Sequence, residues 1–313
     1  MYLPLFFESI KKPLGRDARL FNFNDPMWDV LQDLYNGYSN RSNEHKSHIP
    51  KIIHQIWFGG DLPSDSIELQ KRIIEFNPGY TYKLWTDDDL GFFGDEFADK
   101  LSKISNLGLK SDIFRYLILE FHGGIYLDCD FYCTNNFDVL IRGNEFFAGI
   151  GNPDIKSLPS ILNSCFGCSV NNAIMKSIST ELINNIESFY LLQKAEDIFN
   201  ATGPTFFTEI ILTYLKYEPN KNIVIFPSTF LYPINNRRRY FINQKMLNEN
   251  TYAETVAIHL WNVSWIKSND ILFDKFQAYV PLRVLLLLKK IGLLHLVRII
   301  RFVCKRLNVS IKL

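Results

Sequence analysis

The chain has 313 residues, of which 47% are hydrophobic and 21% charged, a balance that excludes a wholly disordered chain or a coiled coil. Nine of its 34 Lys and Arg lie in residues 275–313, which contain no acid, so the remaining residues hold 25 bases against 33 acids. An acidic body with a strongly basic tail argues against nucleic acid as a partner of the body and predicts an anionic partner for the tail.

The first 48 residues form a polar lead-in, irregular except for one helix predicted near 26–38. Residues 51–58 (KIIHQIWF) are then a short apolar run that ends at Gly59-Gly60. This pattern is typical of a buried strand that leads into a loop.

A helix is predicted from Pro63-Ser64 to about residue 76, where Asn77-Pro78-Gly79 ends it. A second strand follows over 80–85, and the three aspartates at 87–89 suit the N-terminal cap of another helix. Strands therefore alternate with helices in this part of the chain.

Residues 110–121 have apolar side chains close to helical spacing, and His122-Gly123-Gly124 ends this predicted helix. A short strand over 125–127 leads directly to Asp128-Cys129-Asp130. The alternation predicts an α/β fold with a mostly parallel sheet, in which ligands bind beyond the carboxyl ends of the strands. Trp57 and the two aspartates both fall at such ends. Further helices are predicted over 171–189 and 204–217, and further strands near 222–226 and 255–260.

The Asp-X-Asp sequence at 128–130 is the sharpest chemical signal. Residues i and i+2 of an extended segment point to the same side, so Asp128 and Asp130 can face one hard cation, Mg²⁺ or Mn²⁺. Such a cation keeps positions open for phosphate oxygens and neutralises the charge of a leaving diphosphate. Two alternatives stay open here. One is a surface turn with two solvated acids, and the other is a phosphatase with an aspartate nucleophile, whose motif does not expect Tyr132 at its fifth position.

Asp112 and Arg115 lie three residues apart and therefore on one face of the predicted helix 110–121. They can form a simple ion pair in the first turn. An arginine beside a carboxylate is also suited to bind the hydroxyl groups of a sugar.

Five blocks in order, IPKIIHQIWFGG (49–60), NPGYTYKLWTDDD (77–89), SDIFRYLILEFHGGIYLDCDFYC (111–133), ATGPTFFTE (201–209) and AIHLWNVSW (257–265), resemble the DXD-containing glycosyltransferases of family thirty-two. That family includes capsular polysaccharide enzymes and the yeast initiating mannosyltransferase, and the large clostridial glucosylating toxins are more distantly similar. The resemblance covers roughly residues 49–265. It implies a GT-A fold, a nucleotide-sugar donor (weakly favouring a UDP-hexose), a divalent metal, and retention of anomeric configuration.

The resemblance also implies roles for single residues. Asp112 and Arg115 match the pair that binds the donor sugar, and Asp130 completes the expected catalytic set. Asp128 and Asp130 match the DXD, and His259 matches a third metal ligand. Trp57 matches a base-stacking tryptophan, and Ser264 and Trp265 match an element that closes over the diphosphate.

Alternatives stay open for several of these features. His259 can also be a packed core residue, and we expect His54, in the middle of its strand, to be one. Cys165 and Cys168 have redox or half-zinc spacing, but without a second pair we expect two packed thiols. No side chain stands out as a nucleophile, so we favour a front-face displacement.

The tail contains a second basic pattern. At ~100° per residue, Arg283, Lys290, Arg298, Arg301 and Lys305 fall in an arc of ~80°, with Leu, Ile and Val over most of the remainder. This predicts an amphipathic helix over 283–306 that lies in an anionic membrane surface. Packing of this helix on the body or on a second subunit is the alternative.

Arg237-Arg238-Arg239 is either a contact for an anionic acceptor, such as a lipid diphosphate, or a solvated loop.

We therefore expect three parts: a lead-in over 1–48, a GT-A glycosyltransferase domain over 49–274, and a membrane-associating tail over 275–313. The predicted enzyme adds a hexose to a lipid-linked cell-surface glycan, such as a capsule or O-antigen, and has no nucleic-acid partner. The cysteine pattern and the poor match of the N-terminal residues to a signal peptide predict a cytoplasmic location, at the inner face of the plasma membrane. The alternatives are a secreted effector that glycosylates a host protein and a non-catalytic, membrane-bound sugar-nucleotide-binding protein.

Overall fold

A computed structural model describes residues 3–41, 46–153, 157–218 and 222–262, together with the single helical residues 284 and 287. The elements up to the Gly-Gly turn are α1 (Phe6–Leu14), η1 (Gly15–Leu20), α2 (Pro26–Ser39), β1 (Ile52–Ile56), α3 (Ser64–Phe76), β2 (Thr81–Trp85), η2 (Asp87–Phe93), α4 (Asp95–Ser102) and α5 (Leu107–His122). Here η denotes a 3₁₀ helix.

The elements after that turn are β3 (Gly124–Leu127), β4 (Phe131–Cys133), α6 (Asp138–Ile141), β5 (Phe146–Ile150), β6 (Ile161–Cys168), α7 (Ala173–Asn185), η3 (Ile186–Phe189), α8 (Ala195–Ala201), α9 (Pro204–Tyr217), β7 (Ile223–Phe226), η4 (Ser228–Phe230), η5 (Asn236–Phe241), α10 (Gln244–Glu249) and β8 (Ala257–His259). Among these described helices, none combines the length and the apolar character needed to cross a bilayer.

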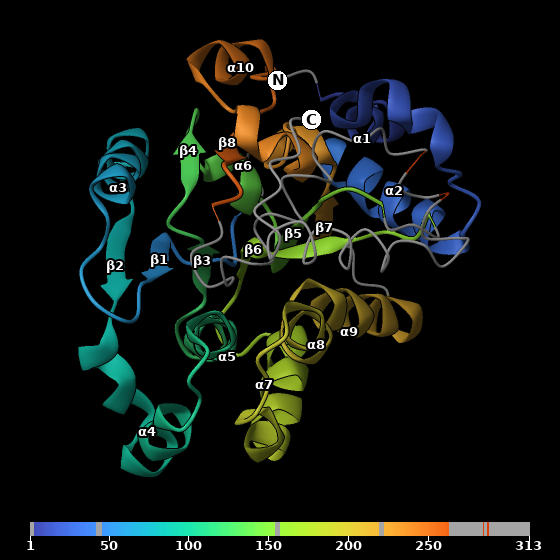
Figure 1. Cartoon of the computed structure of the whole chain (residues 1–313). Coiled ribbons are helices and arrows are strands. Elements are labelled where there is room, and N and C mark those ends of the chain that lie inside the picture. Colours follow the sequence, from blue (N-terminus) through green and yellow to red (C-terminus); the bar gives the residue numbers. More distant parts are fainter. Residues whose placement is uncertain are drawn as a thin grey trace, which may run out of the picture.

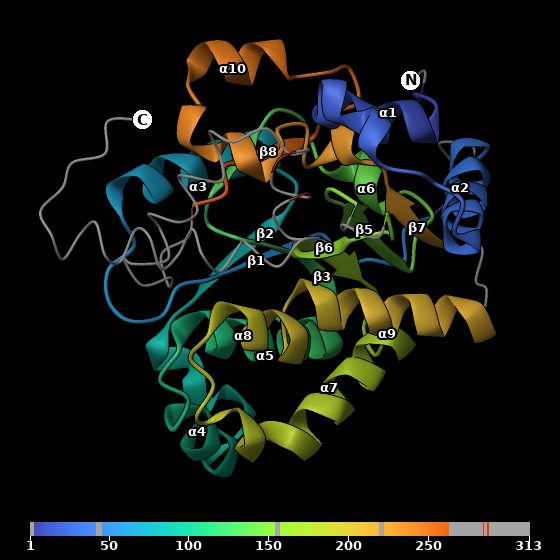
Figure 2. The same cartoon turned by 45° about the vertical axis from the view of Figure 1, so that its right-hand side comes forward.

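Six strands form the central sheet in the order β2-β1-β3-β6-β5-β7, and β6 alone among them runs antiparallel to its neighbours. Strands β4 and β8 form a separate antiparallel pair. Figures 1 and 2 show α5, α7, α8 and α9 on one side of the central sheet, with α1, α10 and the β4–β8 pair on the other. This confirms the predicted α/β class with a mostly parallel central sheet, the arrangement expected of a GT-A fold.

The N-terminal segment is more ordered than the sequence indicated. The predicted helix over 26–38 is confirmed as α2, which begins where the Asp25 side chain accepts a hydrogen bond from the Met27 amide at 2.9 Å and Pro26 presets the first turn. The additional helix α1 was not predicted. Trp28 and Tyr35 of α2 and Phe6 of α1 are buried in the same hydrophobic core as the central sheet.

The turn between α5 and β3 has little room. Gly123 and Gly124 have φ values of 62° and 97°, which favour glycine. A Cβ added at Gly124 would lie 2.7 Å from the carbonyl oxygen of Ile52 on β1. The two glycines therefore allow α5 to reverse directly into a strand that pairs with β1, and this places Asp128 beyond the end of β3.

Candidate active site

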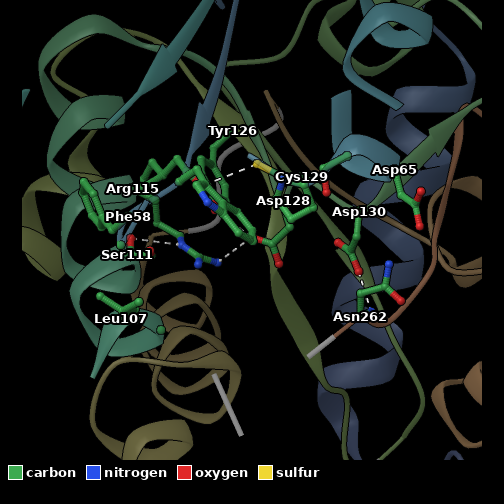
Figure 3. Close-up of a pocket in the computed structure, with 16 residues that line it drawn as sticks. Phe58, Asp65, Leu107, Ser111, Arg115, Tyr126, Asp128, Cys129, Asp130 and Asn262 are labelled. Atoms are coloured by element: carbon green, nitrogen blue, oxygen red, sulfur yellow. Dashed lines mark hydrogen bonds and ion pairs between the residues drawn. The ribbon is translucent and has the colours of Figure 1, made fainter. Parts of the chain in front are cut away.

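A cavity of about 630 Å³ opens at the carboxyl ends of β1 and β3 (Figure 3). Its lining includes Trp57, Arg115, Tyr126, Asp128, Asp130 and Asn262. The predicted position of a ligand site beyond these strand ends therefore coincides with a real cavity.

Asp128 and Asp130 line this cavity, and His259 lies beside them. β4 pairs with β8 in a register that sets Phe131 opposite His259, so the imidazole lies beside the Asp-X-Asp. His259 Nε2 is 3.1 Å from Asp130 Oδ1 and 3.9 Å from Asp128 Oδ2. One potential ligand atom from each of the three residues lies within 4.8 Å of the other two.

Further contacts hold this cluster in place. The backbone N–H of Asn262 donates to Asp130 Oδ2 at 2.7 Å, and the backbone N–H of Leu260 donates to the Asp130 carbonyl at 3.0 Å. The His259 ring stacks on Phe131 at 4.7 Å between centroids and lies 4.3 Å from the Trp261 ring. Trp261 adopts a φ of 61°, an uncommon backbone conformation for a residue other than glycine.

Arg115 reaches Asp128 from α5. Its guanidinium is 3.3 Å from Asp128 Oδ1 and 4.5 Å from the centre of the Tyr126 ring, while the Tyr126 hydroxyl donates to the same Oδ1 at 2.6 Å. Burial raises the pKa of Asp128, and the neighbouring Asp130 adds to this effect while Arg115 opposes it. Burial alone would lower the pKa of Arg115, but the nearby Tyr126, Asp128 and Asp112 raise it, so the guanidinium stays charged.

Asp112 lies behind Arg115, and it is not among the residues that line the cavity. Its Oδ1 lies 3.2 Å from the Arg115 guanidinium and accepts from the Asn163 amide at 2.9 Å, and its Oδ2 accepts from the Thr202 hydroxyl at 3.0 Å. Burial raises the pKa of Asp112 to about 6, against the opposing effect of Arg115. Direct contact between Asp112 and a sugar stays a prediction, whereas its contact with Arg115 is present.

Trp57 is half-buried in the cavity wall, directly after β1. Its amide donates to the Trp85 carbonyl at 2.9 Å, and its indole N–H donates to the Asp61 carbonyl at 3.1 Å. The Gly59 amide of the same loop donates to Asp87 Oδ2 at 2.7 Å. The loop that contains Trp57 and Gly59 is thus held by hydrogen bonds to Trp85, the last residue of β2, and to Asp87, which follows it.

Several residues of the site were missed by reasoning from the sequence. Tyr126 precedes Asp128 by two positions on a strand, a spacing that already indicates the same side. Gln55 donates from its side chain to the Asp128 carbonyl at 3.0 Å, and nothing in its local sequence indicated this. Asn163 and Thr202 support Asp112 from distant parts of the chain, although Thr202 lies in the block ATGPTFFTE.

Other expectations have clear outcomes. His54 is a core residue, with 2% of its surface exposed. Cys165 and Cys168 are free, buried thiols, which confirms the packed-thiol interpretation. Ser264 and Trp265 lie outside the described residues, as does the tail helix 283–306 apart from Val284 and Leu287.

Part of the chain is similar to known glycosyltransferases. Residues 63–147 match the family described as glycosyltransferase sugar-binding region containing DXD motif. The chain is 29% identical over 195 residues to an uncharacterized glycosyltransferase of Acanthamoeba polyphaga mimivirus, covering 60% of this chain and 74% of that protein. It is 37% identical over 154 residues to inositol phosphoceramide mannosyltransferase 3 of Schizosaccharomyces pombe, covering 44% and 42% of the two chains.

Among solved structures, the ligand-free glycosyltransferase domain of the YGT toxin aligns with a TM-score of 0.45 and 12% identity, covering 76% of this chain and 88% of that one. The chain spans about half the length of several of the curated relatives it matches. The matched segment contains Asp112, Arg115, Asp128 and Asp130. Residues 63–147 are therefore similar to the DXD-containing sugar-binding region of glycosyltransferases, and relatives of the chain are named glycosyltransferase and mannosyltransferase.

Proposed function

We propose that this protein is a metal-dependent, retaining glycosyltransferase that moves a hexose from a nucleotide sugar to a lipid-linked cell-surface glycan. The observation that carries the proposal is the cluster of Asp128, Asp130 and His259, whose two aspartates line a cavity together with Trp57 and Arg115. The cavity thereby offers groups suited to each part of a nucleotide-sugar donor: a flat ring for the base, a cation site for the diphosphate, and a guanidinium for the sugar.

The three clustered residues fit a divalent cation. Two carboxylates and one imidazole suit Mn²⁺ or Mg²⁺, and few protein ligands leave positions open for phosphate oxygens. Burial and the proximity of Asp130 raise the pKa of Asp128, and a bound cation would remove this electrostatic cost. When bound, the cation supplies neutralisation of the charge that develops on the leaving diphosphate.

The protein groups around the cluster position the donor. Arg115 is held between Asp112 and Asp128 and over the Tyr126 ring, so it needs little reorganisation to meet the sugar. Tyr126 orients Asp128, and Asn262 orients Asp130. In this arrangement Asp112 acts through Arg115, in addition to the sugar contact that the family resemblance implies.

We further propose a front-face displacement. Asp128 and Asp130 are engaged by the proposed cation site and are therefore poorly placed to act as nucleophiles. The bond between the anomeric carbon and the diphosphate breaks while the acceptor oxygen bonds to the same face. The proton of the acceptor hydroxyl passes to an oxygen of the leaving diphosphate. The chain's contribution is then positioning and electrostatic stabilisation.

A lipid-linked acceptor is supported by the names of relatives and by the charge of the tail. Curated relatives are named inositol phosphoceramide mannosyltransferases, so a mannosyl donor is tested beside the UDP-hexose that the family resemblance weakly favours. Nine bases and no acid in residues 275–313 support the proposal that the amphipathic segment 283–306 holds the enzyme on an anionic membrane. We propose a cytoplasmic location at the inner face of the plasma membrane on the same grounds.

The test is a transfer assay with a panel of UDP- and GDP-sugars in Mn²⁺, first with water, then with lipid-linked acceptors and then with protein acceptors. We expect one sugar nucleotide to be hydrolysed slowly without acceptor and consumed faster with a lipid-linked one. Transfer to proteins but not to lipid-linked glycans would instead favour the effector alternative. Binding of a nucleotide without any turnover would favour the non-catalytic alternative.

A further inference from the structure

A strongly basic face lies outside the cavity, where α1 and η1 meet η5. We call it the α1–η5 face and define it by Lys11, Lys12, Arg16, Arg19, Arg237, Arg238 and Arg239. Within residues 11–19 and 237–239 there are seven bases and one acid, Asp17, although residues 1–274 as a whole carry a net negative charge. Lys11, Lys12, Arg16, Arg19 and Arg238 are exposed. Contact with water alone gives no reason for basic residues to cluster on one face of an otherwise acidic body.

The two parts of the face are in contact although they are far apart in the sequence. The Arg237 guanidinium lies 3.6 Å from Asp17 of η1. Lys12 of α1 lies over the Tyr252 ring at 4.6 Å, and its Nζ lies 3.8 Å from Glu254 Oε1. Figures 1 and 2 show α1 on the same side of the central sheet as α10 and the β4–β8 pair, which carries His259.

Exposed apolar side chains flank these bases. Leu5 precedes the basic stretch with 62% of its surface exposed, and Leu20 follows it with 36% exposed. An anionic bilayer offers both negative headgroups for the bases and an apolar layer for the leucines. A nucleic acid offers phosphates but nothing for the leucines. The combination therefore fits a lipid surface better than a polyanion.

We propose that the α1–η5 face binds the surface of an anionic bilayer. This inference goes beyond the proposed function, because it assigns membrane contact to the folded body instead of the tail. It would hold the body on the membrane with the side of the sheet that carries the β4–β8 pair nearer to the lipid. A lipid-linked acceptor would then reach the enzyme from the surface that the body already touches.

The test uses the full chain and vesicles of phosphatidylcholine and phosphatidylserine in a three-to-one ratio, with binding measured by flotation over a range of lipid concentrations. The variant R16Q/R19Q/R238Q should partition about 100-fold more weakly, since each base near an anionic leaflet contributes about fivefold. The charge-preserving variant R16K/R19K/R238K should partition like the wild type, which separates charge from any effect on folding.

The matched control is K176Q/K194Q/K216Q, which removes the same charge from exposed lysines on and beside α7, α8 and α9, on the opposite side of the sheet. This control should keep near-wild-type partitioning. Equal partitioning of the two glutamine variants, whether both strong or both weak, would overturn the proposal. Donor hydrolysis without vesicles should be unchanged in all variants, so a chain that binds vesicles but turns over no donor would contradict the proposed function alone.

Discussion

Trp57 presents a half-buried indole to the cavity while its backbone and indole N–H are both tied to neighbouring carbonyls. We expect Trp57→Ala to weaken binding of the free nucleoside diphosphate by about 1–3 kcal/mol, the range of a base–aromatic stack. Trp57→Phe should lose less, because a smaller ring still stacks. Calorimetry in the presence of Mn²⁺ measures both, and unchanged affinity in a folded Trp57→Ala protein would contradict the stacking role.

Asp87 fastens the loop of Trp57 through the Gly59 amide. We expect Asp87→Ala to weaken nucleotide binding by about 1 kcal/mol, because one hydrogen bond that preorganises the loop is lost. KM for the donor should rise while kcat stays close to the wild-type value, since the cluster at Asp128 is untouched. Asp87→Asn retains an acceptor oxygen and should restore binding.

The control for this prediction is Asp88→Ala, at the exposed neighbouring position in the same 3₁₀ helix. If both alanine variants change KM equally, the effect comes from charge near the cavity and the positioning role of Asp87 is wrong.

His54 provides a prediction for the pH dependence of stability. Its Nδ1 accepts from the Trp85 indole at 3.1 Å, and its Nε2 lies 3.1 Å from the Gly123 carbonyl, so the neutral ring satisfies both neighbours. Burial lowers the pKa of His54 from 6.5 to about 4. The pKa of His54 is therefore lower in the folded state than in the unfolded state. The stability that the neutral ring contributes is complete above pH 6.5 and is lost as the pH falls toward 4.

The free energy of unfolding should fall by about 1.4 kcal/mol per pH unit in this window, or about 3 kcal/mol in total. Chemical denaturation at a series of pH values measures this change. His54→Asn keeps an acceptor for Trp85 but cannot titrate, so its slope should be correspondingly smaller. The matched variant His48→Asn alters an exposed histidine. If it changed the pH dependence of the free energy of unfolding as much as His54→Asn does, the effect could not be assigned to His54.

At the scale of elements, the turn between α5 and β3 is the most constrained connection to the site. Gly124→Ala should destabilise the fold by about 2 kcal/mol or more, because φ is positive and the new Cβ would contact the Ile52 carbonyl. Gly37→Ala in α2 has open space around it and should stabilise by about 0.5–1 kcal/mol. Thermal and denaturant melts measure both, and a Gly124→Ala protein as stable as the wild type would contradict the close approach of α5 and β3 to β1.

The β4–β8 pair shows what an element contributes that one residue cannot. His259 reaches Asp130 only because Phe131 and His259 are partners in an antiparallel ladder. Arg72 of α3 supports this pair by donating to the Cys133 carbonyl and by stacking over the Tyr132 ring at 4.1 Å. The cluster of Asp128, Asp130 and His259 therefore depends on the packing of α3 against β4 as well as on its own three side chains.

At the scale of the whole molecule, the sequence predicted the elements that carry a strong local pattern. Strands β1, β2 and β3 and helices α3, α5 and α9 have apolar periodicity together with clear Gly, Pro or Asn ends. Strands β5 and β6 were missed. β6 contains Asn163, Ser164 and Gly167 in buried positions, so its composition does not resemble that of a buried strand.

The residues of the candidate site also fall into those that local sequence pattern predicted and those that it did not. The positions of Asp128, Asp130 and Trp57 beyond strand ends followed from local pattern, because an apolar run ending at a polar residue marks the edge of a sheet. The meeting of His259 with Asp130, and of Thr202 and Asn163 with Asp112, depends on contacts between distant segments. The pattern of one segment does not indicate which distant segment it contacts, so only the family resemblance indicated the role that is proposed for His259.

The central claim is that Asp128, Asp130 and His259 hold a cation that supports transfer from a nucleotide sugar. Its most direct test is the rate of donor hydrolysis by the wild type in Mn²⁺ and in EDTA, beside Asp130→Asn and the matched surface variant Asp138→Asn. We predict hydrolysis that EDTA abolishes and Mn²⁺ restores, a loss of at least about 100-fold in Asp130→Asn, and no loss in Asp138→Asn. Full activity in EDTA, or in Asp130→Asn, would contradict the claim.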